Sequence, residues 1–298
     1  MCSKVAGHIK QQDFFKRVIK SGRLSHSYIL SGISGIGKRK FAFELARSLF
    51  CKQGSYFTEC SCSSCTQVKA GTYPDLYIYS GDELKVENIR QISESAGMTG
   101  LASKWKVFIL DEAEKLSNSG QIVAGNAFLK TLEEPGEDCL FLLITSKYEM
   151  IMPTIRSRCS VVDFTPLNEN DIHNVLCNIR PDMDNMAEII KVSGGSVERA
   201  LMIDDLKIGS LINEIENKNF KKFTDFVMMC NDIQVLKSVM EFIYPAALSK
   251  YKKTGIYSYC AYGEYILEIL QRLNYNINID LAKHDFISKT YEVFSERI

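Results

Sequence analysis

The chain has no excess of charge of either sign. Lys and Arg together number 36, and Asp and Glu also number 36, so the net charge is zero. Without a global basic field the protein is not drawn to nucleic acid by its charge, and DNA contact would be local or made through partners. The sequence also lacks an apolar run long enough to cross a membrane, and its first residues lack the apolar core of a signal peptide. We therefore expect a cytoplasmic protein without a membrane partner.

One hydroxyl is missing from a phosphate-binding loop. Residues 31–39 read SGISGIGKR, in which Gly32, Gly37 and Lys38 satisfy the pattern G-x-x-x-x-G-K-[S/T]. Such glycines turn backbone N–H groups toward phosphate oxygens, and the lysine reaches the outer phosphates. Arg39 stands where Ser or Thr would ligate Mg²⁺, and a guanidinium has no acceptor for a metal. The loop predicts a nucleotide-binding fold that no longer turns over nucleotide, and retained Lys38 leaves ATP or ADP binding open.

Hydrophobic residues make up 46% of the 298 residues, enough to bury the cores of about two or three domains. The first half alternates short apolar runs with helical patterns, which is typical of a parallel sheet covered by helices on both faces. We predict strands at residues 28–30, 76–79, 106–110, 139–144 and 160–164, and helices near residues 38–50, 86–96, 120–132 and 148–156.

Beyond Pro166 the pattern changes, and no further strand is predicted. Asn168 is suited to cap a short helix. Further helices are expected at residues 183–192, closed by Gly194 and Gly195, and at 197–203, before a larger helical bundle that runs to the end of the chain.

Two acids end one of the predicted strands, in the phrase KVFILDE at residues 106–112. In a phosphate-loop protein the first acid, Asp111, helps to hold Mg²⁺ and the second, Glu112, orients the attacking water. The structural alternative is that two acids merely end a strand. Thr145 follows another strand, where it either faces the γ-phosphate or lies in a solvated loop.

Four cysteines, at positions 51, 60, 62 and 65, have the spacing C-x8-C-x-C-x2-C in a segment rich in Gly and Ser. This pattern predicts a structural zinc site at about residues 51–65, because tetrahedral thiolate zinc needs four sulfurs on turn-rich backbone. The C-x-C step is tighter than the usual knuckle, so a redox cluster or a site with fewer ligands stays open. The remaining cysteines are expected in core or surface positions: Cys2, Cys139, Cys159, Cys177, Cys230 and Cys260.

Residues 155–159 read IRSRC, with two arginines in a predicted loop. An ordinary solvated turn explains them. The alternative is an arginine finger, whose guanidinium stabilises phosphates bound by a neighbouring subunit.

Together these motifs resemble the AAA+ clamp-loader family, most closely the delta prime subunits of bacterial DNA polymerase III. The resemblance covers roughly residues 5–205, and its most specific phrase is NAFLKTLEEP. The phrases that carry it are LSHSYILS at 24–31, AGTYPD at 70–75, NAFLKTLEEP at 126–135, SRC at 157–159 and GGSVERAL at 194–201.

The resemblance implies an α/β AAA+ domain at residues 1–166, with a parallel five-stranded sheet flanked by helices. A small helical lid at 167–207 and an all-α collar at 208–298 would follow. It makes Arg158 the trans-acting arginine finger. It also places the four cysteines in a zinc module, although the family usually has two residues between the second and third cysteine, and this chain has one between Cys60 and Cys62. The implied, degenerate nucleotide site comprises Gly32, Gly35, Gly37, Lys38, Asp111, Glu112, Thr145 and the lid residue Arg199.

The resemblance further implies a subunit of the DNA polymerase III holoenzyme that itself lacks ATPase and polymerase activity. Its partners would be motor (gamma/tau-like) and delta-like subunits in a hetero-pentameric ring, which loads a sliding clamp on primed DNA. Two alternatives stay open: an active motor-type ATPase, against which Arg39 speaks, and a zinc protein that reads DNA. Zero net charge, with only Lys52 and Lys69 close to the cysteines, speaks against the second.

Overall fold

The computed structural model describes residues 5–117, 122–205, 207–230, 233–273, 275 and 278–295. The chain divides into two compact units, Met1–Asp171 and Ile172–Ile298. The predicted division into nucleotide-fold domain, lid and collar stays a prediction. Within the described ranges no helix is both long and apolar enough to span a membrane.

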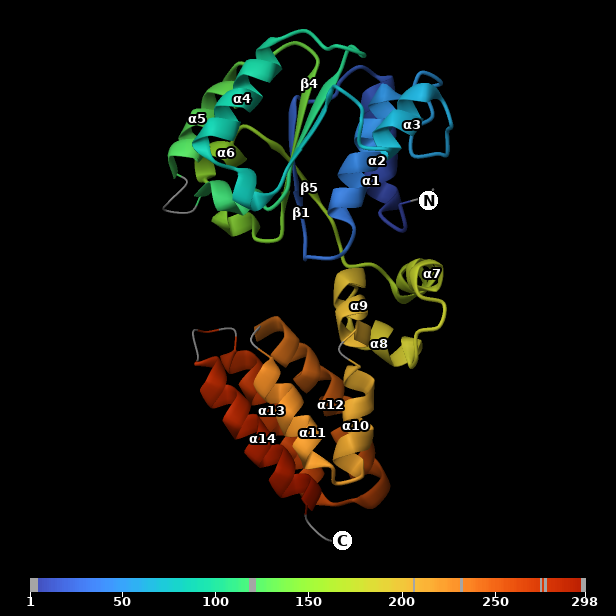
Figure 1. The fold of residues 1–298 in the computed structure, drawn as a ribbon, viewed down its shortest axis with the longest axis vertical. Helices are drawn as coiled ribbons and strands as arrows, with labels where there is room; N and C mark the ends of the chain where they lie inside the picture. Colours follow the sequence, from blue (N-terminus) through green and yellow to red (C-terminus); the bar gives the residue numbers. More distant parts are fainter. Residues whose placement is uncertain are drawn as a thin grey trace. The chain divides into compact units, whose positions relative to one another are not determined.

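The first unit is built on a five-stranded parallel sheet with the order β2-β3-β4-β1-β5. Helices α1, α2 and α3 cover one face, and α4, α5 and α6 cover the other (Figure 1). Alternate residues of each central strand therefore enter two separate cores: Leu30 packs among the first set and Ile29 among the second. The predicted fold class is confirmed. The strands are β1 (Ser27–Ser31), β2 (Leu76–Tyr79), β3 (Lys106–Leu110), β4 (Cys139–Thr145) and β5 (Ser160–Asp163).

The two edge strands depart from the expectation that every strand is covered on both faces. Ile78 of β2 is 38% exposed and Val161 of β5 is 41% exposed, whereas β3 and β4 are buried throughout. The strand order explains the difference, because β2 and β5 each have a neighbour on one side only. Apolar composition alone does not distinguish an edge strand from a central one.

Four of the helices of the first unit correspond to predicted ones, one of them with a correction, whereas α1 and α3 were not predicted. The single helix predicted at 148–156 is wrong: a 3₁₀ turn at Tyr148–Met150 is separated from α6 by Ile151 and Met152. Pro153 explains the break, because the residue before a proline avoids the helical region. Residues 120 and 121 of another predicted helix lie outside the described part. The helices are α1 (Ile9–Lys20), α2 (Lys38–Phe50), α3 (Ser63–Lys69), α4 (Val86–Gly97), α5 (Ile122–Glu133) and α6 (Pro153–Arg156).

In the described part of the second unit the regular elements are all helices, as predicted. Asn168 caps the first helix, since its Oδ1 accepts a hydrogen bond of 2.8 Å from the N–H of Asp171. The next helix begins at Met186, three residues later than predicted, because Asn185 has a left-handed backbone with φ 53°. The helices are α7 (Glu169–Ile179), which crosses the boundary, α8 (Met186–Val192), α9 (Val197–Asp205), α10 (Ile208–Glu216), α11 (Phe220–Met229), α12 (Ile233–Thr254), α13 (Tyr257–Arg272) and α14 (Ile279–Ser295).

Candidate functional site

The phosphate-loop motif connects the end of β1 to the start of α2. Gly35 and Gly37 have φ of 75° and 96°, values that side chains other than glycine rarely adopt. Gly32 is fixed by space, because a Cβ there would lie 2.4 Å from the carbonyl oxygen of Phe164. Nζ of Lys38 donates hydrogen bonds of 2.6 and 2.7 Å to the carbonyls of Gly32 and Ile33, within the loop itself. The predicted phosphate loop therefore depends on glycine at these three positions, and its lysine is bonded to the loop backbone.

Arg39, in the first turn of α2, faces the acid predicted to hold Mg²⁺. Its Nη1 lies 3.6 Å from Oδ2 of Asp111, the residue that follows β3. Strand β4 lies between β1 and β3, and all three end at the same edge of the parallel sheet, which brings the two side chains together. The guanidinium thus balances the charge of the carboxylate that a metal would otherwise neutralise.

Glu112, the second acid, is turned toward a different cation. Its backbone is left-handed with φ 53°, and its Oε2 lies 2.9 Å from Nζ of Lys115. The same Nζ lies 2.9 Å from Oδ1 of Asp82. These two carboxylates raise the pKa of Lys115. The structure therefore ties Glu112 to an exposed cluster of charges around Lys115.

Thr145 is buried at the end of β4 and is bonded to an acid that sequence reasoning missed. Its hydroxyl donates to Oε2 of Glu114 at 2.7 Å, and the hydroxyl of Ser146 donates to Oε1 at 3.3 Å. The N–H of Lys147 donates to the Thr145 oxygen at 3.0 Å. The alternative of a solvated loop is wrong for Thr145. In the sequence, Glu114 could have been considered because it lies two residues after Glu112, in the phrase DEAE at 111–114.

Arg158 lies in the turn between α6 and β5, with its side chain about one-third exposed. Its Nη2 pairs with Oε1 of Glu133, the last residue of α5. Its Nη1 donates to the carbonyl of Thr154 at 2.9 Å. Glu133 belongs to the phrase NAFLKTLEEP, which was singled out as a family signature without a role for this acid.

Arg199 lies on α9 in the second unit, so its position relative to the phosphate loop is not described. Within its own unit the guanidinium pairs with Glu241, and its Nε donates to the hydroxyl of Ser238 at 3.1 Å. Both partners lie on α12. The sensor role predicted for Arg199 stays a prediction.

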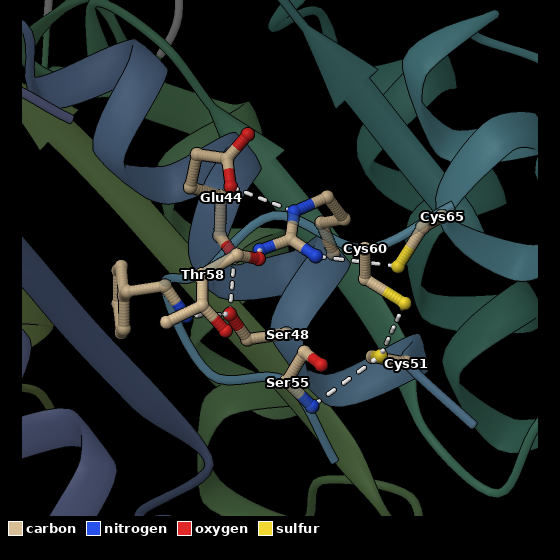
Figure 2. A network of polar contacts seen from close by, with 9 residues as sticks. Glu44, Ser48, Cys51, Ser55, Thr58, Cys60 and Cys65 are labelled. Atoms are coloured by element: carbon tan, nitrogen blue, oxygen red, sulfur yellow. Dashed lines mark hydrogen bonds and ion pairs between the residues drawn. The ribbon is translucent and has the colours of Figure 1, made fainter. Parts of the chain in front are cut away.

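The four clustered cysteines converge in three dimensions. The sulfurs of Cys51, Cys60, Cys62 and Cys65 all lie within 4.8 Å of one another. Figure 2 shows three of these side chains, Cys51, Cys60 and Cys65, pointing toward one another. Sulfurs bound to one tetrahedral zinc at about 2.3 Å are separated by about 3.8 Å, so the donor set fits this metal with small shifts. All nine cysteines of the described part are free, and Cys2 lies outside that part.

A buried arginine holds the cysteine segment to α2. Arg47 is 1% exposed, and its Nη1 donates to the sulfur of Cys65 at 3.2 Å. Its Nη2 donates to the carbonyl of Thr58 at 2.8 Å, and its Nε pairs with Oε2 of Glu44 at 2.7 Å (Figure 2). A cation beside a thiolate cluster offsets part of the negative charge that four thiolates would bring to a metal. Sequence reasoning missed Arg47 because it lies in a helix, outside the cysteine motif.

Hydrogen bonding and burial separate the pKa values of two of the thiols. The backbone N–H of Cys65 lowers the pKa of Cys62 to about 6, whereas burial raises the pKa of Cys65 to about 12. Because the metal ligand is the thiolate, a thiol with a raised pKa such as Cys65 would release its proton when the metal binds.

A family model described as "DNA polymerase III, delta subunit" matches residues 7–168, more than half of the chain. The chain belongs to this family. The AAA+ clamp-loader family predicted from the motifs is thereby confirmed. The matched residues contain the phosphate loop, the cysteine cluster and Arg158.

The curated relatives include both clamp-loader subunit types considered from the sequence, delta prime and gamma/tau. The delta' subunit of DNA polymerase III from Bacillus subtilis is 34% identical over 187 residues, which cover 59% of this chain and 56% of the relative. The gamma subunit from Buchnera aphidicola (Schizaphis graminum) is 34% identical over 206 residues, which cover 66% of this chain and 56% of the relative. The chain thus spans little more than half the length of these relatives.

A solved structure supports the fold over nearly the whole chain. A DNA polymerase III gamma subunit-related protein from Thermotoga maritima aligns with a TM-score of 0.50 over 95% of this chain and 99% of that one, at 16% identity. At this identity the likeness concerns the fold and not the role of individual residues.

Proposed function

We propose that this chain is a delta prime-like clamp-loader subunit that does not itself hydrolyse ATP. The observation that carries the proposal is the ion pair between Arg39 and Asp111. A phosphate-loop site needs a hydroxyl and an acid around Mg²⁺, and here the hydroxyl is replaced by a cation that pairs with the acid. The chain belongs to a DNA polymerase III family, whose subunits work in a complex. A subunit with such a site would support the ATPase of its neighbours and not hydrolyse ATP itself.

Arg158 is the residue through which this chain acts on its neighbour. It would enter the ATP site of an adjacent motor subunit and stabilise charge on the phosphates there. The proposal is supported by its place in a surface turn, with the guanidinium about one-third exposed. An arginine supplied in trans contributes about 10³–10⁵ in rate in other phosphate-transfer systems.

The remaining parts serve assembly. The cysteine cluster binds structural zinc, the helices after residue 207 form a collar, and motor and delta-like subunits complete a ring. That ring loads a sliding clamp on primed DNA, as part of the polymerase holoenzyme in the cytoplasm. Support comes from the converging sulfurs and from the relatives, which are DNA polymerase III subunits.

The alternative function is an active gamma/tau-like motor. It is favoured by gamma and tau relatives, which match this chain with identities close to that of delta'. It requires turnover of ATP by the purified chain in the presence of Mg²⁺, lost on Lys38→Ala. The pairing of Arg39 with Asp111 argues against such turnover.

Substitution of Arg158 tests the proposal. Arg158→Ala is expected to leave the chain folded and to lower the ATPase of the assembled complex by about 10³-fold. Arg156→Ala is the matched control, because Arg156 lies two residues earlier and pairs with Glu149 at 3.0 Å. Normal ATPase in the Arg158→Ala complex would rule out the proposed role.

A further inference from the structure

Glu133 and Arg158 meet on the surface of the first unit although 25 residues separate them in sequence. Glu133 ends α5, and Nη2 of Arg158 donates to its Oε1. We infer that Glu133 is a positioning residue that holds the Arg158 guanidinium on its own chain until a neighbour's phosphates displace it. This inference rests on the proposed function of Arg158.

The backbone of Arg158 is held by two hydrogen bonds within the first unit. The hydroxyl of Ser27, a fully buried residue of β1, donates to the Arg158 carbonyl at 2.8 Å. The Arg158 N–H donates to the carbonyl of Ile155 at 3.1 Å, which closes the turn after α6. The Cα position is thus set by the sheet, and the guanidinium can change partners by side-chain rotation alone.

The end of α5 supplies two attractions for a cation. The carboxylate of Glu133 carries a full charge, and the C-terminal end of the helix carries a partial negative charge. Both side chains are partly exposed, Arg158 by 34% and Glu133 by 49%. Exposed ion pairs of this kind favour the paired state by a factor of only about 1.4 to 5. The contact is strong enough to orient the guanidinium and weak enough to exchange.

A phosphate and Glu133 compete for the same donors. The planar guanidinium binds either a carboxylate or a phosphate through parallel N–H groups, and a carboxylate left beside a bound phosphate would repel it. The neighbour's ATP therefore binds to the fraction of Arg158 that has left Glu133. Since the apparent dissociation constant scales inversely with that fraction, Glu133 weakens apparent ATP affinity by about two- to six-fold.

The experiment measures steady-state ATPase against ATP concentration in the complex assembled from this chain and its partner subunits. Glu133→Gln keeps the shape of the side chain and removes its charge, so KM is expected to fall by about two- to six-fold with kcat little changed. Glu134→Gln is the matched control, since Glu134 is the next residue and is exposed. A melting curve equal to that of Glu134→Gln shows that the Glu133→Gln chain is folded.

A double variant separates positioning from structure. The effect of Glu133→Gln should vanish in an Arg158→Ala background, because no guanidinium is left to hold. The inference about Glu133 is wrong if Glu133→Gln leaves KM unchanged, lowers kcat, or has the same effect in both backgrounds. If Arg158→Ala alone still lowers ATPase in that case, the proposed role of Arg158 as an arginine finger is unaffected. Normal ATPase in Arg158→Ala alone overturns the proposed function, and with it the role of Glu133.

Discussion

Nη1 of Arg39 lies 3.6 Å from Oδ2 of Asp111, between the start of α2 and the end of β3. The pair joins the cation that stands in place of the motif's hydroxyl to the acid predicted to hold Mg²⁺. Because Arg39 is 63% exposed, the contribution of this pair to folding stability is small. Its consequence is chemical: a positive charge is present at the loop without Mg²⁺.

The first prediction concerns metal dependence at this loop. In the purified chain, nucleotide binding is expected to be absent or independent of Mg²⁺. Arg39→Thr restores a hydroxyl and frees Asp111, so Mg²⁺ should then tighten binding by about tenfold, measured by calorimetric titration with and without the metal. Arg39→Thr combined with Asp111→Asn is the control, in which the gain should disappear. Equal Mg²⁺ dependence in wild type and Arg39→Thr would contradict the interpretation.

The second prediction concerns the cysteine cluster. Purified protein should contain about one zinc per chain by metal analysis, and the zinc should be lost more readily as pH falls because protons compete for the thiolates. Cys65→Ser should release the metal and destabilise the first unit by about 2 kcal/mol, which lowers Tm by about 4–8 °C. Cys177→Ser, at an exposed cysteine outside the cluster, should keep the metal. Full zinc content in Cys65→Ser would remove this residue from the ligand set.

The third prediction concerns the buried arginine behind the cluster. Arg47→Met keeps the length of the side chain but leaves Glu44 and the Thr58 carbonyl without their partner. Because an uncompensated partner of a buried pair is costly, stability should fall by about 3 kcal/mol in chemical denaturation. The exposed substitution Arg90→Met should change stability by less than about 0.5 kcal/mol. Adding Glu44→Gln to Arg47→Met should cost less than the sum of the single changes, and strict additivity would argue against the pair.

The fourth prediction concerns pH and His8, which precedes α1. The ring is buried, lies 4.8 Å from that of Phe164 and bonds the carbonyl of Ile36 in the phosphate loop at 2.8 Å. Burial lowers the pKa of His8 below its usual 6.5. The unfolded chain then binds more protons than the folded one, so the contribution of His8 is complete above pH 6.5 and decreases as pH falls below it.

Denaturation at several pH values tests this prediction. His8→Gln should flatten the dependence of stability on pH below 6.5, whereas His284→Gln, at an exposed histidine, should leave it unchanged. An unaltered slope in His8→Gln would show that His8 does not titrate differently in the folded and unfolded states.

Local patterns predicted the sheet because strands and the phosphate loop are encoded by short, contiguous runs. The strands at 76–79 and 106–110 and the helix at 38–50 were placed without error, and the boundaries of the other three strands moved by at most one residue. The burial of β2 and β5 was overestimated, since edge positions depend on strand order, which apolar composition does not record. The break before Pro153 was missed although the proline itself signals it.

The sequence by itself determined which chemical groups are present: a loop lysine followed by an arginine where the motif has a hydroxyl, two acids after a strand, four close cysteines and an arginine in a turn. It could not determine which charges face one another, because ion pairs and hydrogen bonds between distant segments depend on how strands and helices are arranged. Only the tertiary structure decided that Arg39 faces Asp111, that Glu114 accepts from Thr145, and that Glu133 holds Arg158. Parallel strands end at one edge of the sheet, and this shared edge brings the first two of these contacts together across gaps of 72 and 31 residues in the sequence.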